Sequence, residues 1–142
     1  MILFDINIVS ELMRSEPASQ VLRWLDAQPS EVLTLSAIIM AELVFGLEQL
    51  PRARRLRQLE NALVTQIERN FPDRVLAFDH GAAFRYGRLS ADLRRRGISI
   101  GQSDAMIAAI ALHHNATLAT RNVRHFQPCG VRAVNPFDTG TA

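Results

Sequence analysis

Five short apolar runs, separated by longer stretches with helical periodicity, constrain the fold of this 142-residue chain more than any other feature. The runs that we interpret as strands cover residues 2–4, 32–35, 75–78, 117–120 and 131–134. Between them, apolar side chains recur every three or four residues, which is typical of helices that bury one face. Because strands that are about a dozen residues apart pair in parallel through crossovers, the pattern predicts an α/β sandwich around a mainly parallel sheet of four or five strands.

Capping and stop residues mark where several of these helices should begin and end. Ser36, Asp79 and Ser103 each stand just before an apolar helical segment, where a short polar side chain can accept a hydrogen bond from the first turn. Gly97 is placed to end the helix that Asp79 begins. Apolar residues at helical spacing predict a further long helix or helical arm over residues 51–71.

Composition favours a single domain over residues 1–142 and excludes several enzyme classes. All 16 basic residues are arginine, so the chain lacks the lysine of a P-loop nucleotide site and of a pyridoxal enzyme. The single cysteine, Cys129, excludes an intrachain disulfide and an all-cysteine metal site, which fits a reducing cytoplasm. We expect no membrane anchor, because no apolar run approaches the roughly 18 residues of a membrane span.

Polar side chains that follow the predicted strands are the first candidates for a functional site. In open α/β sheets, functional residues gather beyond the carboxyl ends of the strands. Asp5 and Asn7 follow the first strand, and Arg121 and Asn122 follow the fourth. Asp104 opens the helix that precedes the fourth strand. These residues are few, so their combination carries more weight than any one of them.

Several of these candidates also have a purely structural interpretation. Asp5 can cap a helix, Asp104 stands in a first helical turn where the helix dipole favours an acid, and Asn122 fits a turn. Glu42 is harder to explain in this way. It lies about two turns into an apolar helical segment, where a carboxylate is costly unless it is paired.

Three carboxylates in one cleft would favour a divalent cation. If Asp5, Glu42 and Asp104 converge, their mutual repulsion either raises their pKa values or requires a cation. Mg²⁺ and Mn²⁺ take oxygen ligands, and such a site can activate water and neutralise charge on a phosphodiester. The residues therefore favour metal-dependent hydrolysis. A phosphoacceptor domain of the receiver type also places acids after strands, but it needs a lysine near its site.

Four motifs in order along the chain resemble one known family. They are MILFDINIVSE at 1–11, LSAIIMAEL at 35–43, SDAMIAA at 103–109 and LATRN at 118–122. In order and spacing they resemble the PIN-domain ribonucleases, and most closely the FitB-like VapC toxins of bacterial toxin–antitoxin pairs. The resemblance extends from Met1 to the ending at 135–137 and so covers nearly the whole chain.

The resemblance implies a fold, an activity and a set of partners. The family fold is a three-layer sandwich of a parallel sheet between helices, usually as a homodimer, and its activity is endonucleolytic cleavage of RNA, often tRNA, with Mg²⁺ or Mn²⁺. Its metal-binding acids fall on Asp5, Glu42 and Asp104, and its fourth acidic position falls on Asn122. The usual partner is a VapB-like antitoxin, through which alone the toxin would meet operator DNA.

Departures from the family pattern keep a second function open. Ile6 stands where the family usually has Thr or Ser, Ile39 where a Thr is common, and His125 where many relatives have Asp. Together with Asn122, they leave room for a catalytically weakened member that acts mainly as an antitoxin-binding module in promoter autoregulation. We favour the active enzyme, because the three acids remain.

The arginines are candidates for phosphate contacts. Arg121 is the arginine that we place nearest the substrate, with Asn7 as a second candidate substrate contact. Two clusters, Arg52/Arg54/Arg55/Arg57 and Arg94/Arg95/Arg96, can be solvated helix faces or can bind phosphates. The consecutive His113 and His114 close a helix, where the dipole suits them, and their spacing does not indicate a metal site.

Overall fold

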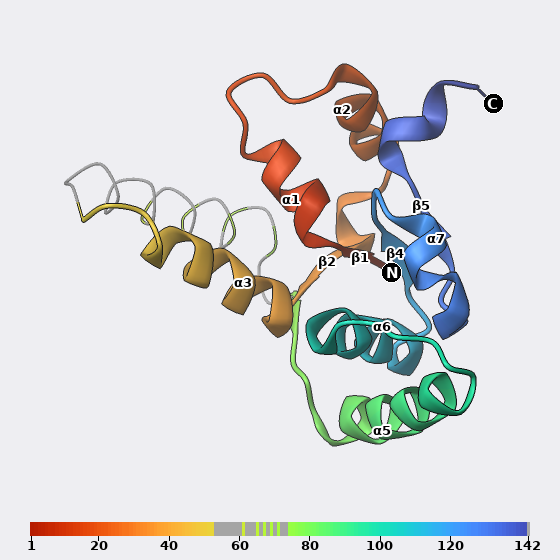
Figure 1. The fold of residues 1–142 in the computed structure, drawn as a ribbon. Helices are drawn as coiled ribbons and strands as arrows, with labels where there is room; N and C mark the ends of the chain where they lie inside the picture. Colours follow the sequence, from red (N-terminus) through yellow and green to blue (C-terminus); the bar gives the residue numbers. More distant parts are fainter. Residues whose placement is uncertain are drawn as a thin grey trace.

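A five-stranded parallel sheet forms the centre of the computed structural model, which describes residues 1–52, 61, 65, 67, 69, 71 and 74–141 (Figure 1). The strands are β1 (Ile2–Phe4), β2 (Leu33–Ser36), β3 (Val75–Leu76), β4 (Thr117–Ala119) and β5 (Ala133–Val134). Every pair of neighbouring strands is parallel, and their order is β3-β2-β1-β4-β5. The predicted parallel sheet is therefore confirmed.

The order of the strands puts a topological switch point between β1 and β4. From β1 the chain builds the sheet outwards through β2 to β3, and it then returns to the other side of β1 to add β4 and β5. Leu3 pairs with Thr34 of β2 on one side and with Leu118 of β4 on the other. The carboxyl ends of β1 and β4 are therefore neighbours, at the place where open α/β sheets bind ligands.

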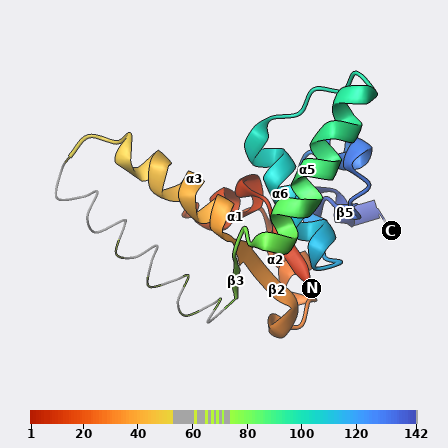
Figure 2. The same ribbon diagram turned by 90° about the horizontal axis from the view of Figure 1, so that it is seen from below.

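Helices cover both faces of the sheet and complete the expected three layers. The α-helices whose bounds fall within the described ranges are α1 (Ile6–Leu12), α2 (Ser19–Asp26), α3 (Ala37–Glu48), α5 (His80–Arg95), α6 (Gln102–His113) and α7 (Val123–Phe126). Short 3₁₀ turns are η1 (Ser30–Val32), η2 (Gln127–Cys129) and η3 (Pro136–Thr141). Figures 1 and 2 show α1 and α2 on one face of the sheet and α6 on the other, with α5 packed outside α6.

The structure confirms two of the three predicted helix caps. The Ser36 hydroxyl accepts a hydrogen bond from the Ile39 N–H at 3.2 Å, and the Asp79 carboxylate accepts one from the Ala82 N–H at 3.0 Å. The prediction for Ser103 is wrong, because α6 begins at Gln102 with Gly101 as its N-cap and has no side-chain cap. Ser103 instead lies inside the first turn of α6.

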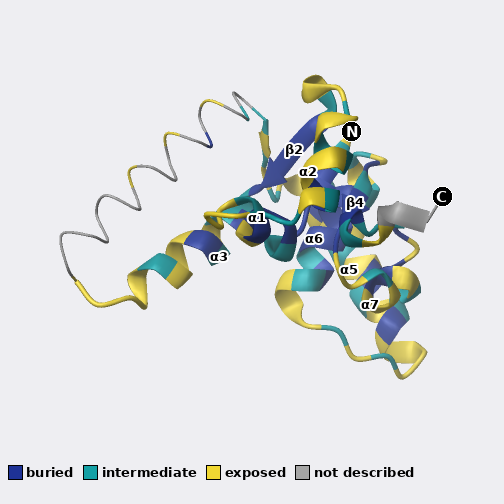
Figure 3. Cartoon of the chain, turned by 90° about the horizontal axis from the view of Figure 1, so that it is seen from above, coloured by how far each residue is buried: buried dark blue, intermediate teal, exposed yellow. Residues whose placement is uncertain are grey.

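Buried side chains gather on the strands and on α6 (Figure 3). Leu3, Phe4, Leu35 and Leu118 of the sheet and several residues of α6 are fully buried. This packing holds the strand ends rigidly, as a site at those ends requires. Of the predicted helix over residues 51–71, most residues, including Arg54, Arg55 and Arg57, lie outside the described residues.

The outer part of α3 is different, because it carries large apolar side chains on its surface. Figures 1 and 3 show α3 projecting from the body of the molecule. Val44, Phe45 and Leu50 are exposed, and Phe45 keeps 68% of its surface accessible. Within the described ranges, no helix combines the length and the apolar character needed to cross a membrane.

Candidate metal centre

Asp5 lies at the carboxyl end of the central strand β1, where it is the N-cap of α1. It is almost completely buried, with 3% of its surface exposed. Its Oδ1 accepts a hydrogen bond from the Ile6 N–H at 2.8 Å, and its Oδ2 accepts one from the Thr120 hydroxyl at 2.7 Å. Burial raises the pKa of Asp5 above its ordinary value and outweighs these hydrogen bonds, and the Asp104 charge raises it further.

Thr120 was not among the predicted site residues, yet it joins the ends of the two central strands. It is fully buried just after β4. Its hydroxyl donates to Asp5 and accepts from the Asn122 N–H at 3.0 Å. A hydroxyl group therefore reaches the Asp5 carboxylate from β4, although Ile6 supplies none from the position where the resembling family has Thr or Ser.

Asn7 links α1 to the segment that follows β4. Its amide Nδ2 donates to Asp5 Oδ2 at 3.2 Å, and its Oδ1 accepts from the Arg121 N–H at 3.1 Å. The nitrogen and the oxygen of the Asn7 side chain amide therefore both form hydrogen bonds within the protein. Contact of Asn7 with the substrate stays a prediction. The Arg121 guanidinium lies over the Phe137 ring, 4.2 Å from the ring centroid.

Glu42 approaches the same region from α3, although it lies far from Asp5 and Asp104 in the sequence. It is half-buried, and burial is the main reason why its pKa is raised. The charges of Asp5 and Asp104 raise the pKa further, while a hydrogen bond with the Ser103 side chain lowers it. The charges of the three predicted acids therefore act on one another, although their carboxylate oxygens do not form a group within 4.8 Å of one another among the described residues. Ser103, which we expected as a cap, contacts Glu42 instead.

Asp104 stands in the first turn of α6, next to a histidine. The His125 Nε2 lies 2.8 Å from Asp104 Oδ2, and both side chains are partly exposed. His125 occupies a position that we noted only as a departure from the family pattern. A hydrogen bond of this kind fixes the orientation of a carboxylate that faces a ligand.

An open cleft of about 1110 Å³ lies beside Asp104. Arg121, Asn122, Arg124 and His125 are among the residues that line it. Asn122 is exposed and is the N-cap of α7, without a side-chain capping hydrogen bond. The cleft therefore places the Asp104 carboxylate beside the side chains of Arg121 and Arg124, an arrangement suited to a phosphodiester held next to a cation, whereas Asp5 and Glu42 are not among its lining residues.

The raised pKa values predict how the stability of the metal-free protein depends on pH. For Asp5 and Glu42, the folded state binds protons more tightly than the unfolded state. Their contribution to stability is therefore fully present below the unfolded-state pKa values, about 4, and it is lost as the pH rises through the raised folded-state values. We expect Mg²⁺ to restore stability at neutral pH, because it favours the ionised carboxylates.

Urea unfolding between about pH 4 and pH 7, in EDTA and again in Mg²⁺, measures both effects. Compared with the wild type, Glu42→Gln should lose part of the pH dependence and most of the stabilisation by Mg²⁺. Glu48→Gln is the matched control, because Glu48 is an exposed carboxylate on the same helix. Equal behaviour of the two variants would contradict the placement of Glu42 in the acidic cluster.

Comparisons with known proteins agree with this fold. Residues 2–129 match the family model described as PIN domain. The chain is 41% identical to "VapC ribonuclease Y4jK" of Sinorhizobium fredii, over 97% of this chain and 99% of that protein. It is 36% identical to "Toxin FitB" of Neisseria gonorrhoeae, over 96% and 99%. A chain in the structure of FitAB bound to an IR36 DNA fragment is similar with a TM-score of 0.88 and 34% identity, covering 96% of both chains.

Proposed function

This chain belongs to the PIN-domain family, and on that premise we propose that it is the toxin of a bacterial toxin–antitoxin pair and cleaves RNA as a metal-dependent endoribonuclease. The observation that supports the activity is that the charges of Asp5 and Asp104 act on Glu42 and that of Asp104 acts on Asp5, which lies at the switch point of the sheet. RNA cleavage fits the cleft beside Asp104, because Arg121 and Arg124 line it together with this acid. We place this activity in the cytoplasm.

The donor groups present fit a hard divalent cation. We propose that Asp5, Glu42 and Asp104 hold Mg²⁺ or Mn²⁺ through carboxylate oxygens, with Asn122 at the fourth position. When bound, the ion neutralises charge on the phosphodiester and activates water for hydrolysis. Thr120 and Asn7 hold the Asp5 carboxylate in place through hydrogen bonds to Oδ2.

Arg121 and Arg124 are the cations that we propose for binding the RNA backbone. Both line the cleft beside Asp104. The backbone of Arg121 is held by Asn7, and its guanidinium rests on Phe137, so little conformational entropy is lost when a phosphate binds. Such contacts hold the RNA without selecting its bases. In the second cluster, Arg96 has a structural role, since it contacts Asp92 at 2.8 Å and the Pro128 carbonyl at 2.9 Å.

We propose an antitoxin as the protein partner, since the similar FitAB structure is a complex on DNA and FitB is named a toxin. Contact with DNA would then go through the antitoxin alone. The apolar surface formed by Val44 and Phe45 on α3 and by Leu50 just after it supports our further proposal of a homodimer. The weakened, purely binding alternative is not favoured, because the acids are retained and Thr120 supplies a hydroxyl to Asp5.

Chelation tests the proposed activity. The purified chain, freed of any antitoxin, should cleave total RNA in Mg²⁺ or Mn²⁺. Excess EDTA should slow cleavage by about a thousandfold or more, since the ion supplies several kcal/mol of stabilisation in the transition state. Cleavage should return when Mg²⁺ is added back. Full activity in EDTA would overturn metal dependence, and the lack of any cleavage together with tight antitoxin binding would support the binding-module alternative.

A further inference from the structure

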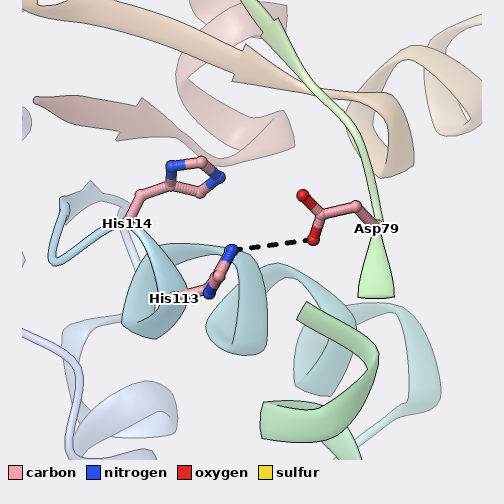
Figure 4. A group of neighbouring side chains, drawn as sticks. All are labelled: Asp79, His113 and His114. Atoms are coloured by element: carbon pink, nitrogen blue, oxygen red, sulfur yellow. Dashed lines mark ion pairs between the residues drawn. The ribbon is translucent and has the colours of Figure 1, made fainter. Parts of the chain in front are cut away.

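A second group of possible metal ligands lies at the end of α6 opposite to Asp104. The group consists of Asp79, His113 and His114, and its ligand atoms all lie within 4.8 Å of one another. Figure 4 shows both imidazole rings and the Asp79 carboxylate turned towards a common space. The sequence did not predict this group, because Asp79 comes from a different segment, just after β3.

Two helix ends bring these residues together. Asp79 is the N-cap of α5, and its Oδ1 accepts the hydrogen bond from Ala82. His113 is the last residue of α6, and His114 is its C-cap. Since α5 and α6 pack side by side, the first turn of one helix faces the last turn of the other. The packing of the two helices therefore fixes the backbone positions from which all three side chains extend.

The position of the His113 ring depends on a glycine of α5. A β-carbon at Gly81 would lie 2.1 Å from Cε1 and 2.5 Å from Nε2 of His113. The ring thus occupies the space that any other residue at this position would fill. Gly81 lets the imidazole approach the helix closely enough for Nε2 to lie 3.7 Å from Asp79 Oδ1.

A simple ion pair accounts for only part of this arrangement. Histidine at a helix C-terminus and aspartate at an N-terminus are each favoured by the helix dipole. That explanation needs one histidine, whereas here His114 also faces the carboxylate that His113 contacts. The two rings lie 4.9 Å apart between centroids at an angle of 71°. Their planes therefore differ, so two ring nitrogens can approach one point from different directions.

We propose that Asp79, His113 and His114 form a second metal site, selective for Zn²⁺ or a similar transition-metal ion and distinct from the acidic centre. Two imidazoles and a carboxylate are typical ligands of Zn²⁺, whereas an all-oxygen set suits Mg²⁺. Tetrahedral Zn²⁺ places its ligand atoms about 3.4 Å apart, so the 4.8 Å spread closes by small rotations of partly exposed side chains. Water takes the fourth position, and the ion clamps α5 to α6.

A Co²⁺ titration followed by visible absorption tests this site. Excess Mg²⁺ is present to fill the acidic centre, and Co²⁺ replaces Zn²⁺ as a coloured probe. The wild type should bind one Co²⁺ per chain with the strong absorption of four-coordinate Co²⁺, and Zn²⁺ should displace it. Asp104→Asn should bind equally well. Asp79→Asn, His113→Asn and His114→Asn should each weaken binding about tenfold or more.

His80→Asn is the matched control, because His80 is exposed and lies next to Asp79 but outside the group. Asp79→Asn keeps a good N-cap, so this variant should fold even if a histidine variant does not. The absence of a four-coordinate spectrum in the wild type would overturn the proposal. The proposal would also be overturned if His80→Asn and His114→Asn lost Co²⁺ affinity equally. Loss of Co²⁺ binding in Asp104→Asn, with binding retained in His114→Asn, would overturn it as well.

Discussion

Asp5→Asn is expected to abolish RNA cleavage by the purified chain and growth arrest on induced expression. The substitution removes the buried charge at the end of β1 but keeps the shape of the side chain. Loss of a carboxylate from the metal centre removes several kcal/mol of transition-state stabilisation, so the cleavage rate should fall by about a thousandfold or more. Quantified RNA cleavage in Mn²⁺ or Mg²⁺ and growth curves measure the two effects.

The fold should survive this change, so lost activity can be separated from misfolding. Asparagine is a good N-cap and can still accept the hydrogen bond from the Ile6 N–H through its Oδ1, while its Nδ2, in the place of Asp5 Oδ2, can donate to the Thr120 hydroxyl. It also relieves the cost of a buried carboxylate whose pKa is raised by burial. Without metal at neutral pH, the variant should therefore unfold at the same or a higher urea concentration than the wild type. Cleavage at the wild-type rate by a folded Asp5→Asn protein would contradict the proposed centre.

Thr120→Val is expected to lower the rate of RNA cleavage by about 10- to 100-fold, which is the usual effect of removing a group that orients a metal ligand. Valine has nearly the shape of threonine but cannot donate to Asp5 Oδ2 or accept from the Asn122 N–H. The Asp5 carboxylate then loses the shortest of its hydrogen bonds in this structure. The cleavage rate over a range of Mn²⁺ concentrations measures this effect, because metal affinity should fall as well.

Thr34→Val provides a matched control for this prediction. Thr34 lies on β2, is 3% exposed and donates its hydroxyl to the Ile2 carbonyl at 2.7 Å. Both valine variants should lose about 1–2 kcal/mol of folding free energy, since each removes the hydrogen bonds of a buried hydroxyl. Only Thr120→Val should lose activity. Equal cleavage rates in the two variants would show that Thr120 does not position Asp5.

The sequence predicts the sheet and singles out the candidate acids, because both follow from short-range patterns. Strand and helix periodicities are local, and a parallel sheet places the ends of its strands on one edge. Asp5 and Asn122 therefore fall together once β1 and β4 are neighbours. Glu42 stands out because a carboxylate in an apolar helical segment needs a specific environment.

Other parts of the site could not be predicted, because they depend on contacts between distant segments. Thr120 reads as an ordinary strand residue until the pairing of β1 with β4 puts its hydroxyl beside Asp5. The sequence pattern places Ser103 as a helix cap. In the structure, however, the N-cap of α6 is Gly101, and the Ser103 side chain forms a hydrogen bond with Glu42. His125 meets Asp104 only when the fold brings these residues, 21 positions apart in the sequence, within hydrogen-bond distance.

The central claim is that Asp5, Glu42 and Asp104 together bind the divalent cation that RNA cleavage requires. The most direct test measures bound Mn²⁺ by electron paramagnetic resonance and RNA cleavage in the same samples. Wild type, Asp5→Asn, Glu42→Gln and Asp104→Asn are compared, with Glu48→Gln as the control. We predict that the three variants lose Mn²⁺ affinity and cleavage in parallel, while the control keeps both. Wild-type Mn²⁺ affinity and cleavage in any of the three would contradict the claim.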